Sequence, residues 1–226
     1  MVSWWQRLFG SGGAAAGGSS GAGRTSGRTT GRTTGVPPSA NGASSFHLRW
    51  VLDGTAAGDT IESAAVTLEV LEPPTVPRLY FWALQADFGG PRGPAGGAHL
   101  GLQWHPQYPA STAVNWGGYR HGGGELDGSS SSLRSTLHNP NTRDLRWLPG
   151  RRYRLRVSRV NAAHHPDALP PAGMVAWRGS VCDLDTGDQV TVRDLYVPGD
   201  RITGVTMWSE VFARCDDPSV TVRWSA

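Results

Sequence analysis

The stretch that decides the fold is His99-Leu-Gly-Leu-Gln-Trp-His105, in which Leu100, Leu102 and Trp104 alternate with polar or small residues. Successive side chains of a β-strand point to opposite faces of its sheet, so this alternation predicts a strand with one buried face. The same period of two recurs throughout residues 46–226, and clusters of Gly, Pro, Asn and Asp separate the segments. The other segments are Phe46–Leu52, Ala65–Leu71, Leu79–Phe88, Ala113–Tyr119, Arg152–Val160, Val175–Val181, Gln189–Val197, Gly204–Phe212 and Val220–Trp224. About ten strands with short links predict an all-β fold, a two-sheet antiparallel β-sandwich of jelly-roll type.

The start of the chain has a different composition. Residues 1–9 contain Trp4, Trp5, Leu8 and Phe9 on one arc of a helical wheel, which predicts a short amphipathic aromatic peptide. Residues 10–45 hold 11 Gly with many Ser, Thr and Ala, and they include no aromatic and no acidic residue. Such a segment buries too little apolar surface to offset its ordering entropy, so we expect a disordered linker ahead of a β-sandwich domain at residues 46–226.

The four large apolar residues of the peptide, Trp4, Trp5, Leu8 and Phe9, need a surface to cover them, because their exposure to water is unfavourable. The peptide either folds back on its own domain, docks into a protein partner, or rests on a membrane surface. A single Arg makes it a weak membrane anchor, so the membrane surface is the least favoured of the three.

Charge and cysteine content exclude several classes. All 21 basic residues are Arg, and residues 46–226 carry 17 of them against 18 acidic residues, so no specific nucleic-acid partner is expected. The longest apolar run, Leu79–Leu84, is too short to span a membrane, and no signal peptide is seen, so we expect a cytoplasmic protein. Cys182 and Cys215 lack metal-ligand spacing and are expected to be free thiols.

Eight tryptophans fall in the expected domain, nearly one for each strand. They could form an aromatic platform for sugar rings, or they could be core residues. Trp82, Trp104 and Trp224 share their strand faces with aliphatic residues, which favours the core.

Polar residues occupy the opposite faces of three consecutive strands. They are Gln85, Asp87, His99, Gln103, His105, Asn115, Tyr119 and His121, with small residues between them. This pattern is typical either of a ligand-binding face, for a glycan or another polar small ligand, or of a solvated sheet face. Three of these residues are histidines, but their spacing defines no metal site, and we expect no metal and no cofactor.

Two charged motifs are candidates for chemistry. Glu125 and Asp127 alternate on one strand face, as the carboxylates of a glycoside hydrolase would, and they are the weak catalytic candidates of the chain. The run Arg151–Arg159 would either grip an anion or form a strand with its Arg side chains in solvent.

Three stretches resemble bacterial concanavalin A-like (lectin or glucanase) sandwich domains of uncharacterised function, over residues 78–187. They are Leu79–Phe88, the following His-Leu-Gly-Leu-Gln103, and Trp177–Gly187. The Glu125-Leu-Asp127 motif is similar to the Glu-x-Asp-x-x-Glu strand of laminarinase-type glucanases, but Ser129–Ser132 stand where the last acid would be. The resemblance implies a jelly-roll fold and transfers no catalytic residue. We therefore expect a non-catalytic ligand-binding domain, with a carbohydrate as the candidate ligand. The alternatives are a glycoside-active enzyme and an interaction protein that docks through residues 1–9.

Overall fold

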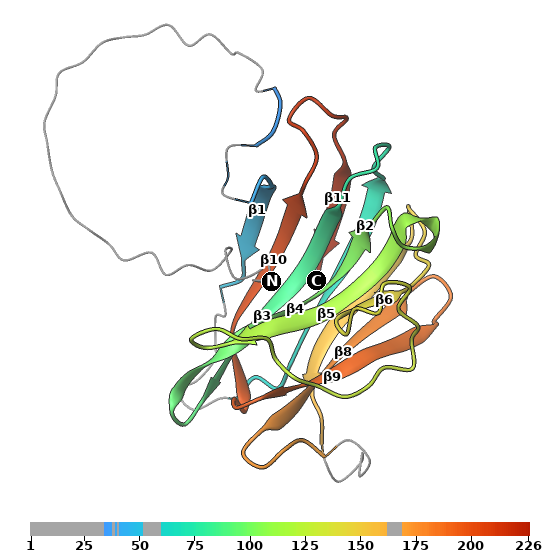
Figure 1. Cartoon of the computed structure of the whole chain (residues 1–226). Coiled ribbons are helices and arrows are strands. Elements are labelled where there is room, and N and C mark those ends of the chain that lie inside the picture. Colours follow the sequence, from blue (N-terminus) through green and yellow to red (C-terminus); the bar gives the residue numbers. More distant parts are fainter. Residues whose placement is uncertain (1–33, 38, 40, 52–59, 162–168) are drawn as a thin grey trace, which may run out of the picture.

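The computed structural model describes residues 34–37, 39, 41–51, 60–161 and 169–226, and it consists of two antiparallel sheets packed face to face (Figure 1). Sheet A has six strands in the order β1-β10-β3-β4-β5-β6, and sheet B has five in the order β11-β2-β7-β8-β9. The expected all-β, two-sheet antiparallel sandwich is confirmed. The peptide at residues 1–9 and most of the linker at residues 10–45 lie outside the described residues.

Along the chain, β3 to β6 follow one another in sheet A and β7 to β9 follow one another in sheet B, whereas β1, β2, β10 and β11 cross from one sheet to the other. Sheet A is made of β1 (Ser44–Arg49), β3 (Tyr80–Gly90), β4 (Gly93–Trp104), β5 (Thr112–Arg120), β6 (Thr142–Asp144) and β10 (Arg201–Val211). Sheet B is made of β2 (Ser63–Glu72), β7 (Arg152–Arg159), β8 (Val175–Asp183), β9 (Gln189–Val197) and β11 (Thr221–Ser225). A short 3₁₀ turn, Pro109–Ser111, leads into β5.

Each of the ten segments expected from the sequence overlaps an observed strand. The expectation missed β6, because three residues are too short to show a period. It also placed the start of β4 six residues late, because the Gly- and Ala-rich stretch from Gly93 to Ala98 carries no alternation of apolar and polar residues.

The hydrophobic core lies between the sheets. Trp82, Trp116 and Trp177 are fully buried there, and Trp104 and Trp224 pack against its margin. Trp116 donates a hydrogen bond from Nε1 to the Trp177 carbonyl over 3.3 Å, and Trp177 donates from Nε1 to the Gly199 carbonyl over 3.0 Å, so the polar edges of these two rings are paired. The assignment of Trp82, Trp104 and Trp224 to the core is confirmed.

The Arg-rich run forms β7 in sheet B. Tyr153, Leu155 and Val157 are buried, whereas Arg152, Arg154 and Arg156 are exposed, as alternation predicts. Ion pairs link the neighbouring arginines to acidic partners, Arg152 to Asp185 over 3.1 Å and Arg159 to Glu62 over 2.6 Å. The run is therefore a solvated strand face.

Two smaller expectations also concern the described chain. Cys182 and Cys215 are both half-buried free thiols. Within the described ranges, no helix has the length and apolar character needed to cross a membrane.

Candidate functional site

Sheet A has two faces of different character. Its inner face packs against sheet B, whereas the other, which we call the outer face, points away from the core. The strand register sets outer-face residues side by side in rows. The first row is Ser45, Glu210, Phe81, Gln103 and Ala113; the second is His47, Trp208, Ala83, Gly101 and Asn115; the third is Arg49, Thr206, Gln85, His99 and Gly117.

An aromatic cluster lies in the middle of the outer face. The ring of Phe81 meets Trp208 edge to face at a centroid distance of 4.9 Å, and it meets His99 at 5.6 Å. Gly101 on β4 makes room for this arrangement, since a Cβ there would lie 2.7 Å from Cε2 of Phe81. Phe81, Ala83 and Trp208 form an apolar cluster separate from the main core.

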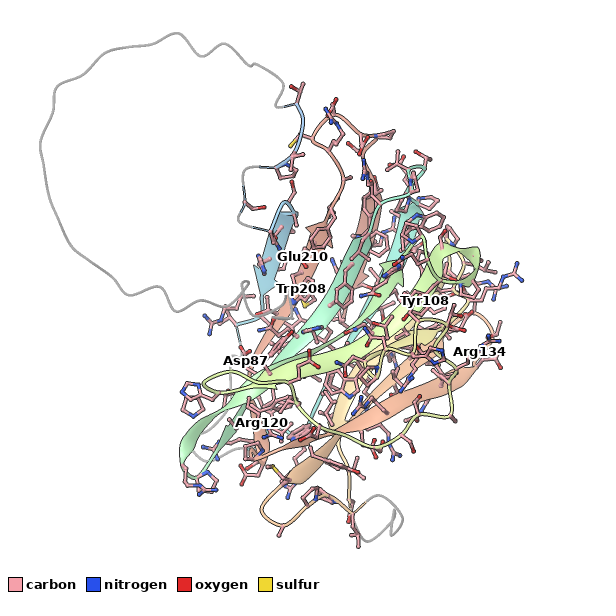
Figure 2. The ribbon with its side chains drawn as sticks, viewed as in Figure 1. Asp87, Tyr108, Arg120, Arg134, Trp208 and Glu210 are labelled. Carbon is pink, nitrogen blue, oxygen red and sulfur yellow. The ribbon has the colours of Figure 1, made fainter. Side chains whose placement is uncertain are left out.

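Glu210 lies on β10 close to Trp208 (Figure 2), and the strand register pairs it with Phe81. Its side chain is buried, and burial raises the pKa of its carboxyl above the ordinary value of a glutamate, because desolvation disfavours the charged form. Asn41 donates a hydrogen bond from Nδ2 to Oε1 over 2.8 Å, which partly offsets that rise. The second oxygen, Oε2, has no hydrogen-bond partner among the described residues.

Two amide side chains extend the polar part of the face. Asn115 donates from Nδ2 to the Thr142 hydroxyl over 2.8 Å, whereas its Oδ1 is buried without a partner in the described part of the chain. Oε1 of Gln103 is likewise buried without a hydrogen-bond partner among the described residues. Buried polar atoms are usually paired, so Gln103, Asn115 and Glu210 together offer unfilled hydrogen-bonding capacity on a single face.

Gln85 differs from those amides because its hydrogen bonds are satisfied. Trp208 donates from Nε1 to Gln85 Oε1 over 3.2 Å, and Gln85 donates from Nε2 to Asp87 Oδ1 over 2.8 Å. The Asp87 carboxylate lies between Gly97 and Gly204, which have no side chain to displace it. This chain of hydrogen bonds fixes the Trp208 ring in place.

His99 is a neutral imidazole at physiological pH. Burial lowers its pKa to about 4, because desolvation disfavours the charged imidazolium. Its ring lies 5.6 Å from Trp208 and from Phe81, between centroids. His99 therefore contributes a neutral aromatic ring beside Phe81 and Trp208 rather than a positive charge.

The sequence-derived site is partly assembled. Gln85, Asp87, His99, Gln103, Asn115 and Tyr119 share the outer face, as alternation predicts. His105 lies beyond the end of β4 and packs its ring against Tyr108 at 4.9 Å, and His121 is exposed in the turn after β5. The alternative of a plain solvated face does not hold at its centre, where His99, Gln103 and Asn115 are at most 5% exposed. Ligand binding by this face stays a prediction.

The acidic pair at Glu125 and Asp127 is no part of this face. Both side chains are exposed, and Asp127 is neutralised by an ion pair with Arg120. Leu126 between them is buried and anchors the loop, with its backbone N–H donating to the Gly118 carbonyl over 2.9 Å. In the ranges that the structure covers, no group of three or more His, Cys, Asp or Glu is placed to hold a metal ion.

Sequence reasoning missed Glu210 and Asn41. Glu210 follows Trp208 by two residues in the expected strand Gly204–Phe212, so alternation alone would have put both on one face. Asn41 gave no signal, because it lies in the Gly- and Ser-rich stretch and reaches Glu210 only in the folded chain.

Comparison with known proteins gives a fold likeness only. No family model matches the chain, and no curated protein matches it. Among solved structures, scytalidoglutamic peptidase with a peptide-based transition state analog matches at 10% identity and a TM-score of 0.38, covering 74% of this chain and 63% of that one. SCP-B, a member of the eqolisin family of peptidases in complex with the tripeptide Ala-Ile-His, matches at 9% identity and a TM-score of 0.36, covering 74% and 62%. A second scytalidoglutamic peptidase structure, with a transition state analog inhibitor, matches at 9% and 0.35, covering 68% and 60%.

These comparisons correct the expected function. The matching solved structures are peptidases, which contradicts a non-catalytic, carbohydrate-binding domain and gives no support to a concanavalin-like lectin or glucanase. The chain spans about three fifths of the length of these peptidases. At such scores the likeness assigns no role to any residue, so the chemistry of the site has to be argued from the outer face itself.

Proposed function

We propose that the outer face of sheet A is a hydrolytic centre for amide bonds, with Glu210 as its general base and acid. The observation that carries the proposal is the state of Glu210, a buried carboxyl with a raised pKa and one oxygen without a partner among the described residues. A carboxyl tuned in this way holds and releases protons closer to neutral pH than an exposed glutamate does.

Gln103 is the second participant. It lies in the same row as Glu210 with one strand between them, so the two Cα atoms are separated by two strand spacings, roughly 9–10 Å. Both side chains are long enough to contact one small group placed between them. The Gln103 amide, whose two orientations exchange an acceptor for a donor, supplies an N–H for a developing oxyanion.

The reaction follows from these two roles. Ionised Glu210 accepts a proton from water while the water oxygen bonds to the substrate carbonyl carbon, and the carbonyl oxygen takes the negative charge beside Gln103. Protonated Glu210 then gives its proton to the leaving nitrogen, the carbon–nitrogen bond breaks, and a carboxylic acid and an amine are formed. The rings of Phe81 and Trp208 exclude water around this centre.

A peptide is the amide substrate that we propose. Its backbone carries the carbonyl to be attacked together with N–H donors, which the unfilled acceptor oxygens of Gln103 and Asn115 require. Two of the peptidase structures named above are described with a peptide-based analog or a tripeptide, and the substrate class proposed for this chain rests on its own acceptors.

A mixed peptide library analysed by mass spectrometry tests the proposal. We expect the full chain to cleave peptides, Glu210→Gln to reduce the rate about 10²- to 10⁴-fold, and Glu125→Gln to keep it. Glu125 is a matched control because it is an exposed glutamate outside the outer face. Equal cleavage by the Glu210→Gln chain would refute the role of Glu210. Absence of cleavage by the wild-type chain would refute the function.

A further inference from the structure

The first strand of sheet A has a free edge. Among the described residues, β1 pairs with β10 alone and ends the strand order of the sheet (Figure 1). The Trp50 N–H donates to the Val205 carbonyl over 3.0 Å, so the even-numbered residues of β1 direct their backbone groups toward β10. Because alternate residues of an antiparallel strand bond to opposite sides, the N–H and C=O groups of Ser45, His47 and Arg49 point to the free edge.

Apolar side chains are exposed on the same strand. Leu48 lies opposite Met207 of the core and so belongs to the inner face of sheet A, and Phe46 shares that face by alternation. Phe46 is nevertheless 60% exposed and Leu48 is 40% exposed, and every residue of β1 is exposed. The packing of the two sheets therefore leaves the inner side of β1 in water.

The features that normally protect an edge strand are missing from β1. Its sequence, Ser44-Ser-Phe-His-Leu-Arg49, contains no Pro and no Lys, and Arg49 at its last position is its only Arg, Asp or Glu. Its register with β10 runs over all 6 residues without a bulge. An edge of this kind accepts a strand from another chain, so β1 is a surface for strand addition.

The strand is complementary to a second copy of itself. In an antiparallel pair with His47 opposite His47 of the other copy, each Phe46 lies opposite a Leu48, so both exposed apolar side chains gain an apolar neighbour across the strands. The outward backbone groups of both strands then form about six N–H···O=C bonds. A pairing that sets Phe46 opposite Phe46 would leave Leu48 opposite Ser44, so the register centred on His47 buries more apolar surface.

Charge favours the same register. Arg49 of one copy comes opposite Ser45 of the other, and Ser45 is paired with Glu210 on β10. The Cα atoms of that Arg49 and that Glu210 are then two strand spacings apart, roughly 9–10 Å. Each Arg49 therefore approaches a carboxyl group of the other copy, and the two Arg49 side chains lie at opposite ends of the pair, away from each other.

We propose that two copies of the chain associate through antiparallel pairing of their β1 strands about a two-fold axis at His47. The pairing joins the two sheets A into one continuous sheet, and the same surface is used by both copies, as a two-fold interface requires. This interface goes beyond the hydrolytic function and does not depend on it.

Disulfide trapping in the full chain tests the register. In a background of Cys182→Ser and Cys215→Ser, the substitution His47→Cys sets two Cα atoms about 5.5 Å apart across the axis, a separation that a disulfide bridges. Under mild oxidation we expect this variant to form a covalent dimer on non-reducing electrophoresis. Ser45→Cys is the matched control, because its two copies lie roughly 14 Å apart and should not cross-link. Ser45→Cys combined with Arg49→Cys should cross-link, since these positions face each other.

Sedimentation equilibrium of the unmodified chain tests the association itself. We expect a dimer in the wild type, and we expect Phe46→Lys with Leu48→Lys to weaken it at least about tenfold, because charges on an edge strand oppose pairing. Both positions are exposed, so the fold should survive, which far-UV circular dichroism checks. Leu137→Lys is the control. It charges a leucine that is as exposed as Leu48 but lies in the loop before β6, and it should leave the dimer intact.

Three results would overturn the proposal. One is a wild type that stays monomeric at about 100 μM, a concentration at which a micromolar contact is formed. Another is a covalent dimer of Phe46→Cys in place of His47→Cys, or of Ser45→Cys to the same extent. The third is equal association of the wild type and the double lysine variant. A dimer that cleaves no peptide refutes only the hydrolytic centre, whereas a monomer that cleaves peptides refutes only this interface.

Discussion

Asn41 donates a hydrogen bond from Nδ2 to Oε1 of Glu210 over 2.8 Å, although 169 positions separate the two residues. The bond joins the segment before β1 to the outer face and orients the carboxyl, so that Oε2 is the oxygen left for a substrate. It also opposes the effect of burial, because a hydrogen bond to a carboxylate favours the ionised form.

Asn41→Ala should therefore raise the pKa of Glu210 further. Carboxyl chemical shifts followed by NMR through a pH titration measure this directly. Thr186→Ala is the control, because it removes a side-chain hydrogen bond, to Asp188, in the turn between β8 and β9 of sheet B and leaves the Asn41–Glu210 contact untouched. An unchanged Glu210 titration in Asn41→Ala would show that the amide does not act on the carboxyl.

Glu210 should make the folded state less stable as the pH rises. Because its pKa is raised in the folded state, the folded chain binds the proton more tightly than the unfolded chain. Its contribution to stability is present below the ordinary glutamate value and is lost as the pH rises through the raised pKa. Urea unfolding across this range should show the loss in wild type and not in Glu210→Gln, and the same slope in both proteins would contradict the raised pKa.

His99 should produce the opposite slope. Its pKa falls to about 4 on burial, so the unfolded chain binds the proton more tightly between about 4 and the ordinary histidine value of about 6.5. Stability is present above 6.5 and is lost as the pH falls through this window, by about 3 kcal/mol. Urea unfolding of His99→Phe, which keeps a ring between Phe81 and Trp208, should lack this loss; a wild-type imidazole that titrates near 6.5 by NMR would contradict it.

Gly101 is required by the packing of the outer face. A Cβ at this position would lie 2.0 Å from the Trp82 carbonyl oxygen and 2.7 Å from the Phe81 ring. Gly101→Ala should destabilise the chain by about 1–3 kcal/mol, measured by urea unfolding. Gly187→Ala is the comparison, since its Cβ meets no atom and only its positive φ opposes the change. An equal or smaller loss at Gly101 would show that β3 and β4 adjust to the added methyl group.

The fold was predictable because alternation is a local signal. In β7 (Arg152–Arg159), charged residues alternate with large apolar or aromatic residues, and the exposed and buried positions follow that alternation. The same signal put Gln85, His99, Gln103 and Asn115 on one face. Alternation along a strand shows which residues share a face, but it does not show what covers that face. The burial of Gln103 and Asn115 was therefore not predictable.

The key residues of the site escaped for a related reason. In the sequence, Glu210 resembles any solvated acid of a strand. Its raised pKa arises from burial beside the apolar cluster of Phe81 and Trp208, and Phe81 is distant from Glu210 in the sequence. Glu125 and Asp127 drew attention because they form a short motif, whereas the folded chain leaves them in solvent. Local motifs therefore misled where long-range packing decides the chemistry.

The most direct test of the Glu210 centre is the pH dependence of kcat/KM for a cleaved peptide, measured in the wild type and in Asn41→Ala. If ionised Glu210 accepts the proton of water, the acidic limb of the profile coincides with the NMR pKa of Glu210, and both move to higher pH together when Asn41 is replaced. A limb that differs from the pKa of Glu210, or that stays in place when that pKa moves, would contradict the account.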